Sequence, residues 1–176
     1  KNDDNDTAET PPLSNPKLVW SPVNSHDRII DLIRSAHSTI YLEVENLGDN
    51  DVQAALKEQA QAGVKVLVVV PACVEGGGAR NKPFMEDLAS AGVDARLSMP
   101  PYSATNPYIH AKSIVVDEKT FYVGSENFSF NSLEKARELG IIETDAKISS
   151  AIIETINYDS SLSAMATQAT VQSCAN

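Results

Sequence analysis

Strand-like and helix-like segments alternate along the first half of this chain, and this alternation restricts the fold more than any other feature of the sequence. Between residues 27 and 36, apolar side chains recur at the i, i+3, i+4 and i+7 spacing of an amphipathic helix. A β-branched run at Thr39–Val44 indicates a strand, and an apolar run at Val64–Val70 is typical of a strand that is covered on both faces. The pattern predicts an α/β protein, and we expect a mixed β-sheet flanked by helices on both faces.

Composition divides the chain into three parts. Residues 1–16 are acidic and contain three prolines with little to bury, so we expect a flexible leader or linker. Residues 17–158 form the expected domain, and residues 159–176 a C-terminal tail that is poor in large apolar groups. The other expected elements are a first strand at 17–20, a helix that starts after Asp49 or Asn50 and ends at Gly63, a helix at 83–91, a strand at 93–97, a motif hairpin, a turn or short helix at 132–137, a strand at 138–144 and a helix at 146–158.

The charge balance argues against a general polyanion binder. The chain has 14 Lys and Arg against 24 Asp and Glu, which gives a formal net charge of −10. This charge opposes non-specific attraction to nucleic acid or to an anionic membrane surface, although local fields can still be positive. The sequence has no apolar run of the length that a membrane span requires.

Two cysteines, Cys73 and Cys174, leave two readings open. They either form one bridge that holds the C-terminal tail in an oxidising compartment, or they are unrelated thiols. The cysteine pair, together with Lys1 in place of an initiator Met, favours a secreted or periplasmic location.

One run of residues, HAKSIVVDEKTFYVGSEN, carries the chemistry. It places six residues at fixed spacing: His110, Lys112, Asp117, Gly124, Ser125 and Asn127. A chance match to such a pattern in a chain of this length is on the order of one in a million, given residue usage of roughly one in twenty. A nucleophile, a cation and two hydrogen-bonding side chains within one hairpin are what an enzyme that attacks a phosphate ester needs.

Strand geometry predicts how these side chains meet. His110 and Lys112 lie on the same face of a strand, about 6 to 7 Å apart. A reversal around Glu118 and Lys119 gives a register in which paired residue numbers sum to 237. This register places Asn127 opposite His110 and Ser125 opposite Lys112.

Two further motif residues have structural interpretations. Asp117 has the opposite parity from His110, so we expect its carboxylate to accept hydrogen bonds from the turn Glu118–Thr120. Gly124 lets a backbone or a ligand approach closely.

The pattern H-x-K-x4-D-x6-G-S-x-N resembles that of the phospholipase D superfamily, the HKD phosphodiesterases, and the resemblance extends over about residues 17–158. It implies that His110 attacks phosphorus and becomes a covalent phosphohistidine, while Lys112, Ser125 and Asn127 bind the phosphate oxygens. It also implies that Glu138, at the start of the next strand, orients the histidine. Asp117 and Gly124 then remain structural members of the motif.

Family members use two copies of this motif, and the chain has one. The general acid of the family is the histidine of the second motif, and neither His26 nor His37 begins an H-x-K pattern. We therefore expect a second HKD-motif chain as partner, either in a homodimer or as the complementary half of a two-motif enzyme. We expect no metal and no cofactor, because the three histidines show no recognised ligand spacing.

Three functions are compatible with these observations. The favoured one is a phosphodiesterase of the phospholipase D type that hydrolyses or transfers a phospholipid headgroup ester. The first alternative is a dimeric, metal-independent endonuclease of the same superfamily. The second alternative is a non-catalytic half-domain that completes a partner's active site.

Overall fold

The structure, a computed structural model, describes residues 15–171 and Cys174. Its strands are β1 (Leu18–Ser21), β2 (Thr39–Val44), β3 (Lys65–Pro71), β4 (Asp94–Ser98), β5 (Lys112–Val116), β6 (Thr120–Gly124), β7 (Glu138–Thr144) and β8 (Ala164–Met165). Its helices are α1 (Ser25–Arg34), α2 (Asn50–Gln61), α3 (Asn81–Ser90), α4 (Phe130–Glu134) and α5 (Ala146–Leu162). Most of the expected leader, residues 1–16, lies outside the described residues.

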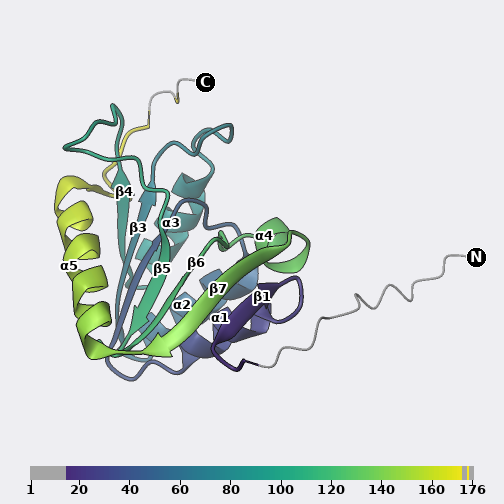
Figure 1. Cartoon of the computed structure of the whole chain (residues 1–176). Helices are drawn as coiled ribbons and strands as arrows, with labels where there is room; N and C mark the ends of the chain where they lie inside the picture. The colour runs from purple at the N-terminus through teal and green to yellow at the C-terminus, as the bar shows by residue number, and fades with distance from the viewer. Residues whose placement is uncertain (1–14, 172–173, 175–176) are drawn as a thin grey trace, which may run out of the picture.

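The eight strands form one mixed sheet in the order β1-β7-β6-β5-β2-β3-β4-β8 (Figure 1). Strands β2, β3 and β4 are parallel to one another, as expected for strands joined by helices. Strand β5 runs antiparallel to β2 and begins the hairpin that carries the motif. The prediction of a mixed α/β sheet is therefore confirmed.

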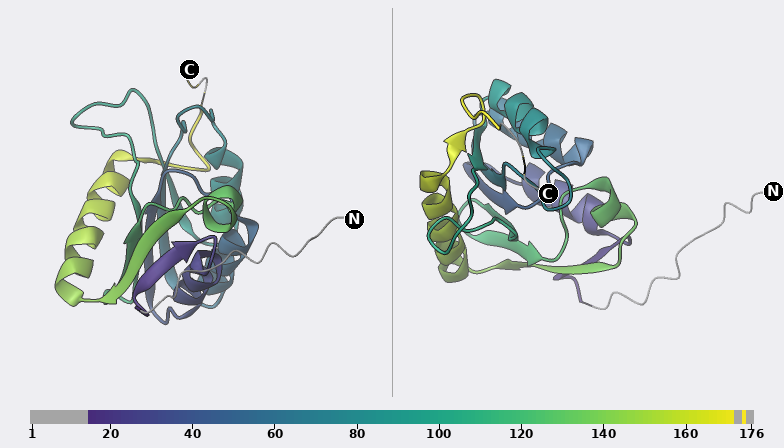
Figure 2. Two further views of the ribbon diagram at one scale, coloured as in Figure 1. Left: turned by 45° about the vertical axis from the view of Figure 1, so that its right-hand side comes forward. Right: turned by 90° about the horizontal axis from the view of Figure 1, so that it is seen from above.

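Helices cover both faces of this sheet. Figure 2 shows α5 alone on one side, with α1, α2 and α3 on the other. The larger core lies under α1 to α3 and includes Ile33, Leu42, Leu56 and Ile114, all fully buried. A smaller cluster of Val69, Ile109 and Ile156 lies under α5. The predicted arrangement of helices on both faces is confirmed as well.

The ends of α2 show how local chemistry sets these elements. The Oδ1 atom of Asp49 accepts hydrogen bonds from the backbone N–H groups of Asp51 and Val52, both at 3.0 Å, and so caps the helix. Gly63 follows the last turn with a φ of 95°, a conformation that a residue with a Cβ rarely adopts. Both features fit the boundaries expected from the sequence.

The described part of the C-terminal segment contains more regular structure than the sequence indicated. Helix α5 continues four residues past the predicted end at Tyr158, to Leu162, and β8 then pairs with β4 and forms the edge strand of the sheet. A disulfide joins Cys73 to Cys174, with 5.4 Å between their Cα atoms. The bridge reading of the two cysteines is therefore the one that the structure adopts.

The hairpin register differs from the predicted one by one residue. Ser113 pairs with Val123 and Val116 with Thr120, so paired numbers sum to 236. The cause is the turn: Asp117, Glu118 and Lys119 all lie outside the ladder, and the first two have φ values of 51° and 59°. This turn of three residues displaces every partner of β5 by one position. As to membrane insertion, no helix among the described residues has the length and apolar character needed to cross a bilayer.

Candidate active site

The candidate site lies at the end of the sheet where the parallel strands β2, β3 and β4 have their carboxyl ends. Strand β2 ends at Val44, which pairs with Lys112, the first residue of β5. Glu45 follows β2 directly and therefore lies beside this lysine. In open α/β sheets, the carboxyl ends of the strands are the usual location of ligand sites.

One carboxylate oxygen joins three polar side chains at this edge. Oε2 of Glu45 lies 3.2 Å from Nε2 of His110 and 3.2 Å from Nζ of Lys112. It also accepts a hydrogen bond of 3.1 Å from Nδ2 of Asn127. The second oxygen, Oε1, accepts a hydrogen bond of 2.8 Å from the hydroxyl of Tyr108. The structure thus brings His110, Lys112 and Asn127 together around a residue that the sequence reading did not single out.

Asn127 reaches the cluster through the segment that follows β2. Backbone of this segment pairs with the loop after β6: Leu47 forms a parallel bridge with Phe128, and the Phe128 N–H donates to the Asn46 carbonyl at 3.1 Å. The Asn46 N–H donates to Oδ1 of Asn127 at 3.1 Å, which leaves Nδ2 for Glu45. The sequence placed all of these groups within one hairpin, but the hairpin alone does not assemble the site, because the β2 segment holds Asn127 in place.

The electrostatics favour an ionised Glu45. Burial of this side chain raises the pKa of its carboxyl group, but hydrogen bonds from Tyr108, Asn127 and Lys112 lower it by more, so the net pKa falls below the ordinary value. A carboxylate with charge-assisted hydrogen bonds on both oxygens is a fixed negative centre at the sheet edge.

Lys112 is held with little freedom. Its side chain is 6% exposed. Its ammonium group donates to the carbonyl of His110 at 2.7 Å and lies 3.1 Å from Nδ1 of the same residue. With the contact to Glu45, all three ammonium hydrogens have a partner.

His110 is the exposed member of the cluster. Its side chain is 64% exposed, and both ring nitrogens have partners. Because Glu45 accepts at Nε2 and Lys112 donates at Nδ1, this geometry selects the neutral tautomer with hydrogen on Nε2. The lone pair on Nδ1 then accepts a hydrogen bond from the ammonium group of Lys112. This ammonium group can donate the same hydrogen to a phosphate oxygen instead.

Two of the residues predicted for the site lie elsewhere. Ser125 faces β7, where its hydroxyl accepts from the Leu139 N–H at 3.2 Å, so it does not join the cluster. Glu138 accepts a hydrogen bond from the hydroxyl of Ser132. Among the described residues, the carboxylate beside the His110 ring belongs to Glu45 and not to Glu138. The shifted register explains why Ser125 does not lie opposite Lys112. Its polar groups form hydrogen bonds with β7 instead of facing β5.

Asp117 holds the backbone in place, as expected, but its hydrogen-bond partners differ from the expected ones. Its carboxylate accepts from the backbone N–H groups of His37, Ser38 and Thr39 at 2.8 to 3.2 Å, instead of from its own turn. Burial raises the pKa of this carboxyl group, but the backbone hydrogen bonds outweigh that effect and lower the pKa to about 2. Asp117 thus joins the hairpin turn to the start of β2.

Gly124 allows a close approach, but by protein atoms. It pairs with Gly140 of β7, and a Cβ at position 124 would collide with the Tyr122 hydroxyl and with the Cα of Gly140. The Tyr122 hydroxyl crosses this gap and donates to the buried carboxyl group of Glu126.

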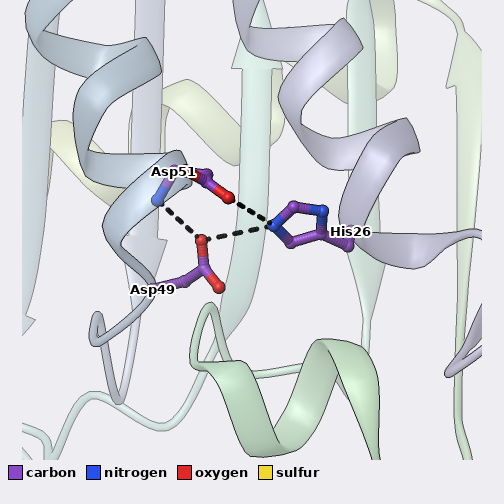
Figure 3. Close-up of side chains that lie close together, drawn as sticks. All are labelled: His26, Asp49 and Asp51. Carbon is purple, nitrogen blue, oxygen red and sulfur yellow. Dashed lines mark hydrogen bonds and ion pairs between the residues drawn. The ribbon is translucent and has the colours of Figure 1, made fainter.

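A second polar cluster involves His26, a histidine that does not begin an H-x-K pattern. Its Nε2 lies 3.3 Å from Oδ2 of Asp51 and 3.6 Å from Oδ1 of Asp49, at the starts of α1 and α2 (Figure 3). The three residues offer ligand atoms within 4.8 Å of one another. However, Oδ1 of Asp49 already caps α2, and the positive ends of two helices disfavour a cation here. Helix capping explains the cluster, and we assign no metal to it.

Comparison with known proteins identifies the family. Residues 29–160 match the family described as cardiolipin synthase, PLD-like domain, which covers most of the chain. The protein therefore belongs to the phospholipase D superfamily, as the motif indicated.

Relatives with different activities share this similarity. The chain is 27% identical to phospholipase D Z of Dictyostelium discoideum over 157 residues, which cover 77% of the chain and 34% of that protein. It is 30% identical to the 5'-3' exonuclease PLD3 of Bos taurus over 74% of the chain and 29% of that protein. The chain therefore spans about a third of the length of these relatives.

A solved structure supports the fold. The phospholipase D family member Nuc of Salmonella typhimurium superposes with a TM-score of 0.72 at 23% identity, over 84% of this chain and 95% of that one. At this identity, the likeness is one of fold.

Proposed function

We propose that the protein is a phosphodiesterase in which His110 attacks the phosphorus of a diester. The observation that supports this most is the convergence of His110, Lys112 and Asn127 on Oε2 of Glu45. The three donors lie within reach of one small anion, and an oxygen of a phosphate group has the charge and hydrogen-bonding capacity to share them.

The first step follows from the tautomer. A non-bridging phosphate oxygen takes over the ammonium hydrogen that points at Nδ1 of His110, which frees the Nδ1 lone pair. Nδ1 then forms a bond to phosphorus as the bond to the leaving oxygen breaks. Glu45 holds the hydrogen on Nε2 and offsets the positive charge that the ring acquires in the phosphohistidine.

Lys112 and Asn127 stabilise the charge that develops on the phosphate. Their nitrogens, now on Glu45, are positioned to donate to the equatorial oxygens of the transition state. Because Lys112 is buried and the Asn127 amide is fixed by Asn46, both nitrogens stay in place while they exchange a hydrogen-bond partner. The Ser125 hydroxyl has no part in this mechanism.

The leaving oxygen needs a proton from a general acid. We propose that a second chain supplies this acid. His26 is surrounded by carboxylates, and His37 adjoins Asp117 at the opposite edge of the sheet. A second His110, brought into the same cleft by a two-fold axis, donates the proton, or the motif histidine of a complementary half-enzyme does so. It then deprotonates the water or alcohol that breaks the P–N bond.

A phospholipid is the favoured substrate, because the net charge of −10 opposes a long polyanion such as nucleic acid more than it opposes a single headgroup ester. The nuclease alternative draws support from the 30% identity to a 5'-3' exonuclease. The third possibility, a half-domain without catalysis, conflicts with a complete set of nucleophile, cation and orienting carboxylate.

The mechanism is tested by trapping the intermediate. Rapid acid-free quenching during turnover, followed by mass spectrometry, is expected to find the phosphoryl group, with its remaining ester arm still attached, on the peptide that contains His110. The His110→Ala variant is expected to lose both adduct and activity, while His37→Ala, which changes an exposed histidine outside the site, keeps both. A working enzyme with no adduct under any quench condition rejects covalent catalysis by His110.

Two further measurements address assembly and substrate. Light scattering at the assay concentration is expected to show a dimer, and an active monomer would contradict the need for a second histidine. Choline release from phosphatidylcholine vesicles and nicking of plasmid DNA are then compared with one preparation, and the His110→Ala protein serves as the blank. Nicking without choline release would replace the phospholipid proposal with the nuclease alternative.

A further inference from the structure

Helix α5 carries a line of apolar and uncharged side chains on its exposed surface. Ile148, Tyr158 and Leu162 are 46%, 57% and 42% exposed. Ala151 and Thr155 are exposed as well and complete a spacing of three, four, three and four residues along the helix. This spacing is that of a helix which packs along its length against another apolar surface. We call these five residues the helix stripe.

A second apolar surface lies on the same side of the sheet, beside α5. Val19 of β1, Tyr122 of β6 and Ile142 of β7 pack into the core under α1 to α3. Because side chains alternate along a strand, the residues of opposite parity in these strands point to the side of α5. Val123 fits this, since it lines a cavity together with Ile152 of α5. The residues of this surface, which we call the sheet strip, are Leu18, Trp20, Val123, Leu139 and Ile141.

Strand pairing makes the sheet strip continuous. Leu18 pairs with Ile141, Trp20 pairs with Leu139, and Ile141 also pairs with Val123. Helix α5 packs on β2 to β6. Among the described residues, no helix covers the same face of β7 and β1, as both views in Figure 2 show. The sheet strip therefore lies bare beside α5.

These two surfaces hold most of the apolar groups that the protein exposes. Four of the six large apolar side chains that are exposed among the described residues belong to them: Leu139, Ile148, Tyr158 and Leu162. Neither surface contains a charged residue, although the chain has a net charge of −10. Apolar surfaces of this kind mark interaction sites.

A second copy of the chain fits both surfaces at once. A sheet face of this kind is normally buried under a helix, and an apolar helix stripe is normally buried against another element. In a two-fold dimer, contact between the stripe of one protomer and the strip of its partner generates the reverse contact as well. A membrane is disfavoured as the occupant, because the net charge of −10 opposes adsorption to anionic lipid.

Both surfaces reach the end of the sheet that carries the candidate site. After α5, Ala164 of β8 pairs with Leu97 near the carboxyl end of β4, so α5 ends at this side. Leu139 accepts a hydrogen bond from the backbone N–H of Ser125, within the motif. Ile109, the residue before the proposed nucleophile, packs under α5. A two-fold axis parallel to the strands therefore places both candidate sites at one end of the dimer.

We propose that the partner of this chain is a second copy, and that α5 of each protomer packs on the sheet strip of the other around a two-fold axis parallel to the strands. The choice of a second copy rests in part on the proposed function, which needs a histidine from another chain. The helix stripe and the sheet strip are then the surface through which the partner brings its motif to the same end of the molecule.

The first test places one negative charge on each surface of the full chain. Tyr158→Glu in the helix stripe and Leu139→Glu in the sheet strip are each expected to weaken the dimer about tenfold or more, because a charge in an apolar interface loses its hydration. Light scattering over a dilution series measures the dissociation constant. Asn157→Glu, at an exposed α5 position outside the stripe, is the matched control and is expected to stay within about twofold of wild type.

A cross-linking test shows which surfaces meet and does not depend on a disruptive variant. Tyr158→Cys and Leu139→Cys proteins are mixed, allowed to exchange subunits and treated with a short bismaleimide, while the native cysteines stay protected in the Cys73–Cys174 disulfide. Mass spectrometry is expected to find a linked dimer that contains one copy of each variant. A mixture of Asn157→Cys and Leu139→Cys is the control and is expected to give no linked dimer.

Four results overturn this interface. The first is a wild type that stays monomeric at its highest soluble concentration, and the second is an equal dissociation constant for wild type and both charge variants. The third is a link that forms within Tyr158→Cys alone, because α5 then packs on α5. The fourth is binding of monomeric wild type to phosphatidylcholine vesicles that both charge variants lose, which assigns the two surfaces to a membrane.

Activity assays on the same proteins separate this inference from the proposed function. A dimer that is linked between positions 158 and 139 but hydrolyses no diester supports the interface and overturns the proposed function. A monomeric Tyr158→Glu protein with full activity also supports the interface, and it removes the need for a second histidine. Loss of both the dimer and the activity in Tyr158→Glu supports the interface together with the shared site.

Discussion

Glu45 and Lys112 form an ion pair of 3.2 Å in which the side chains are only 10% and 6% exposed. A buried pair of this kind is stable only when the remaining polar atoms of both groups also find partners. Tyr108 and Asn127 satisfy the carboxylate, and His110 satisfies the ammonium group. The motif lysine is thus positioned by a residue that lies outside the motif.

Replacement of Glu45 is expected to disable the proposed nucleophile. In Glu45→Gln, the ring of His110 loses the carboxylate that fixes the Nε2 hydrogen, and the imidazolium charge of the intermediate is no longer offset. We expect kcat to fall by about 100-fold or more, because the loss of an orienting carboxylate from a catalytic histidine can cost about 10⁴-fold. Steady-state kinetics measure the effect, and Glu118→Gln, an exposed turn residue at the opposite edge of the sheet, is the control.

The same assay separates Glu45 from Glu138 as the orienting residue. Within one chain, Glu138 bonds Ser132, so Glu138→Gln is expected to reduce kcat much less than Glu45→Gln. If Glu138→Gln reduces kcat as strongly, its carboxylate reaches a histidine of the second copy, and Glu45 is not sufficient to orient the ring.

Asp117 is expected to contribute to stability and not to catalysis. Its carboxylate anchors three consecutive backbone N–H groups, and hydrogen bonds to a charged group contribute about 1.5 to 3 kcal/mol. Asp117→Ala is therefore expected to lower the free energy of unfolding by about 2 kcal/mol in urea titrations at pH 7. Because the folded-state pKa is lowered to about 2, this stability is present above the ordinary pKa and is lost as the pH falls toward 2.

The pH dependence provides the check on Asp117. The difference in stability between wild type and Asp117→Ala is expected to shrink between pH 4 and pH 2, while Asp31→Asn, at an exposed position on α1, remains close to wild type throughout. A difference that is constant over this range would mean that packing, and not the carboxylate charge, accounts for the effect.

Local signals in the sequence predicted the order of strands and helices well. Periodicity at residues 27–36 and the apolar run at 64–70 indicated elements that the structure contains as α1 and β3. These signals work because each depends on which face of one element is buried.

The parts of the site that the sequence did not reveal depend on contacts between distant segments. Glu45 meets Lys112 because β2 pairs with β5, two strands that are 67 residues apart at this contact, and no local pattern encodes that pairing. The available signal was a pair of acidic residues at the carboxyl end of β2. Glu43 lies near the end of this strand, and Glu45 follows the strand directly. The one-residue shift in the hairpin arose from a turn whose length the sequence leaves open.

The disulfide between Cys73 and Cys174 is expected to stabilise the C-terminal segment. It closes a loop of 101 residues, and native disulfides typically contribute about 2 to 4 kcal/mol. Reduction, or the double Cys73→Ser and Cys174→Ser change, is expected to lower the urea midpoint by a corresponding amount. The reducing agent is expected to have no effect on the double variant, and equal midpoints for oxidised and reduced wild type would show that the bridge contributes nothing.

His26 is expected to make stability fall as the pH rises through neutrality. Burial lowers the pKa of its imidazole, but the carboxylates of Asp49, Asp27, Glu134 and Asp51 raise it by more, so the net pKa lies above 6.5. A raised folded-state pKa adds stability that is fully present below the unfolded pKa and is lost as the pH increases through the folded one. The contribution of such partly exposed pairs is about 1 kcal/mol or less. Thermal unfolding from pH 5.5 to 8.5 is expected to show this decline in stability in wild type and in the control His37→Gln. A weaker decline is expected in His26→Gln. Identical profiles for wild type and His26→Gln would assign the decline to other groups.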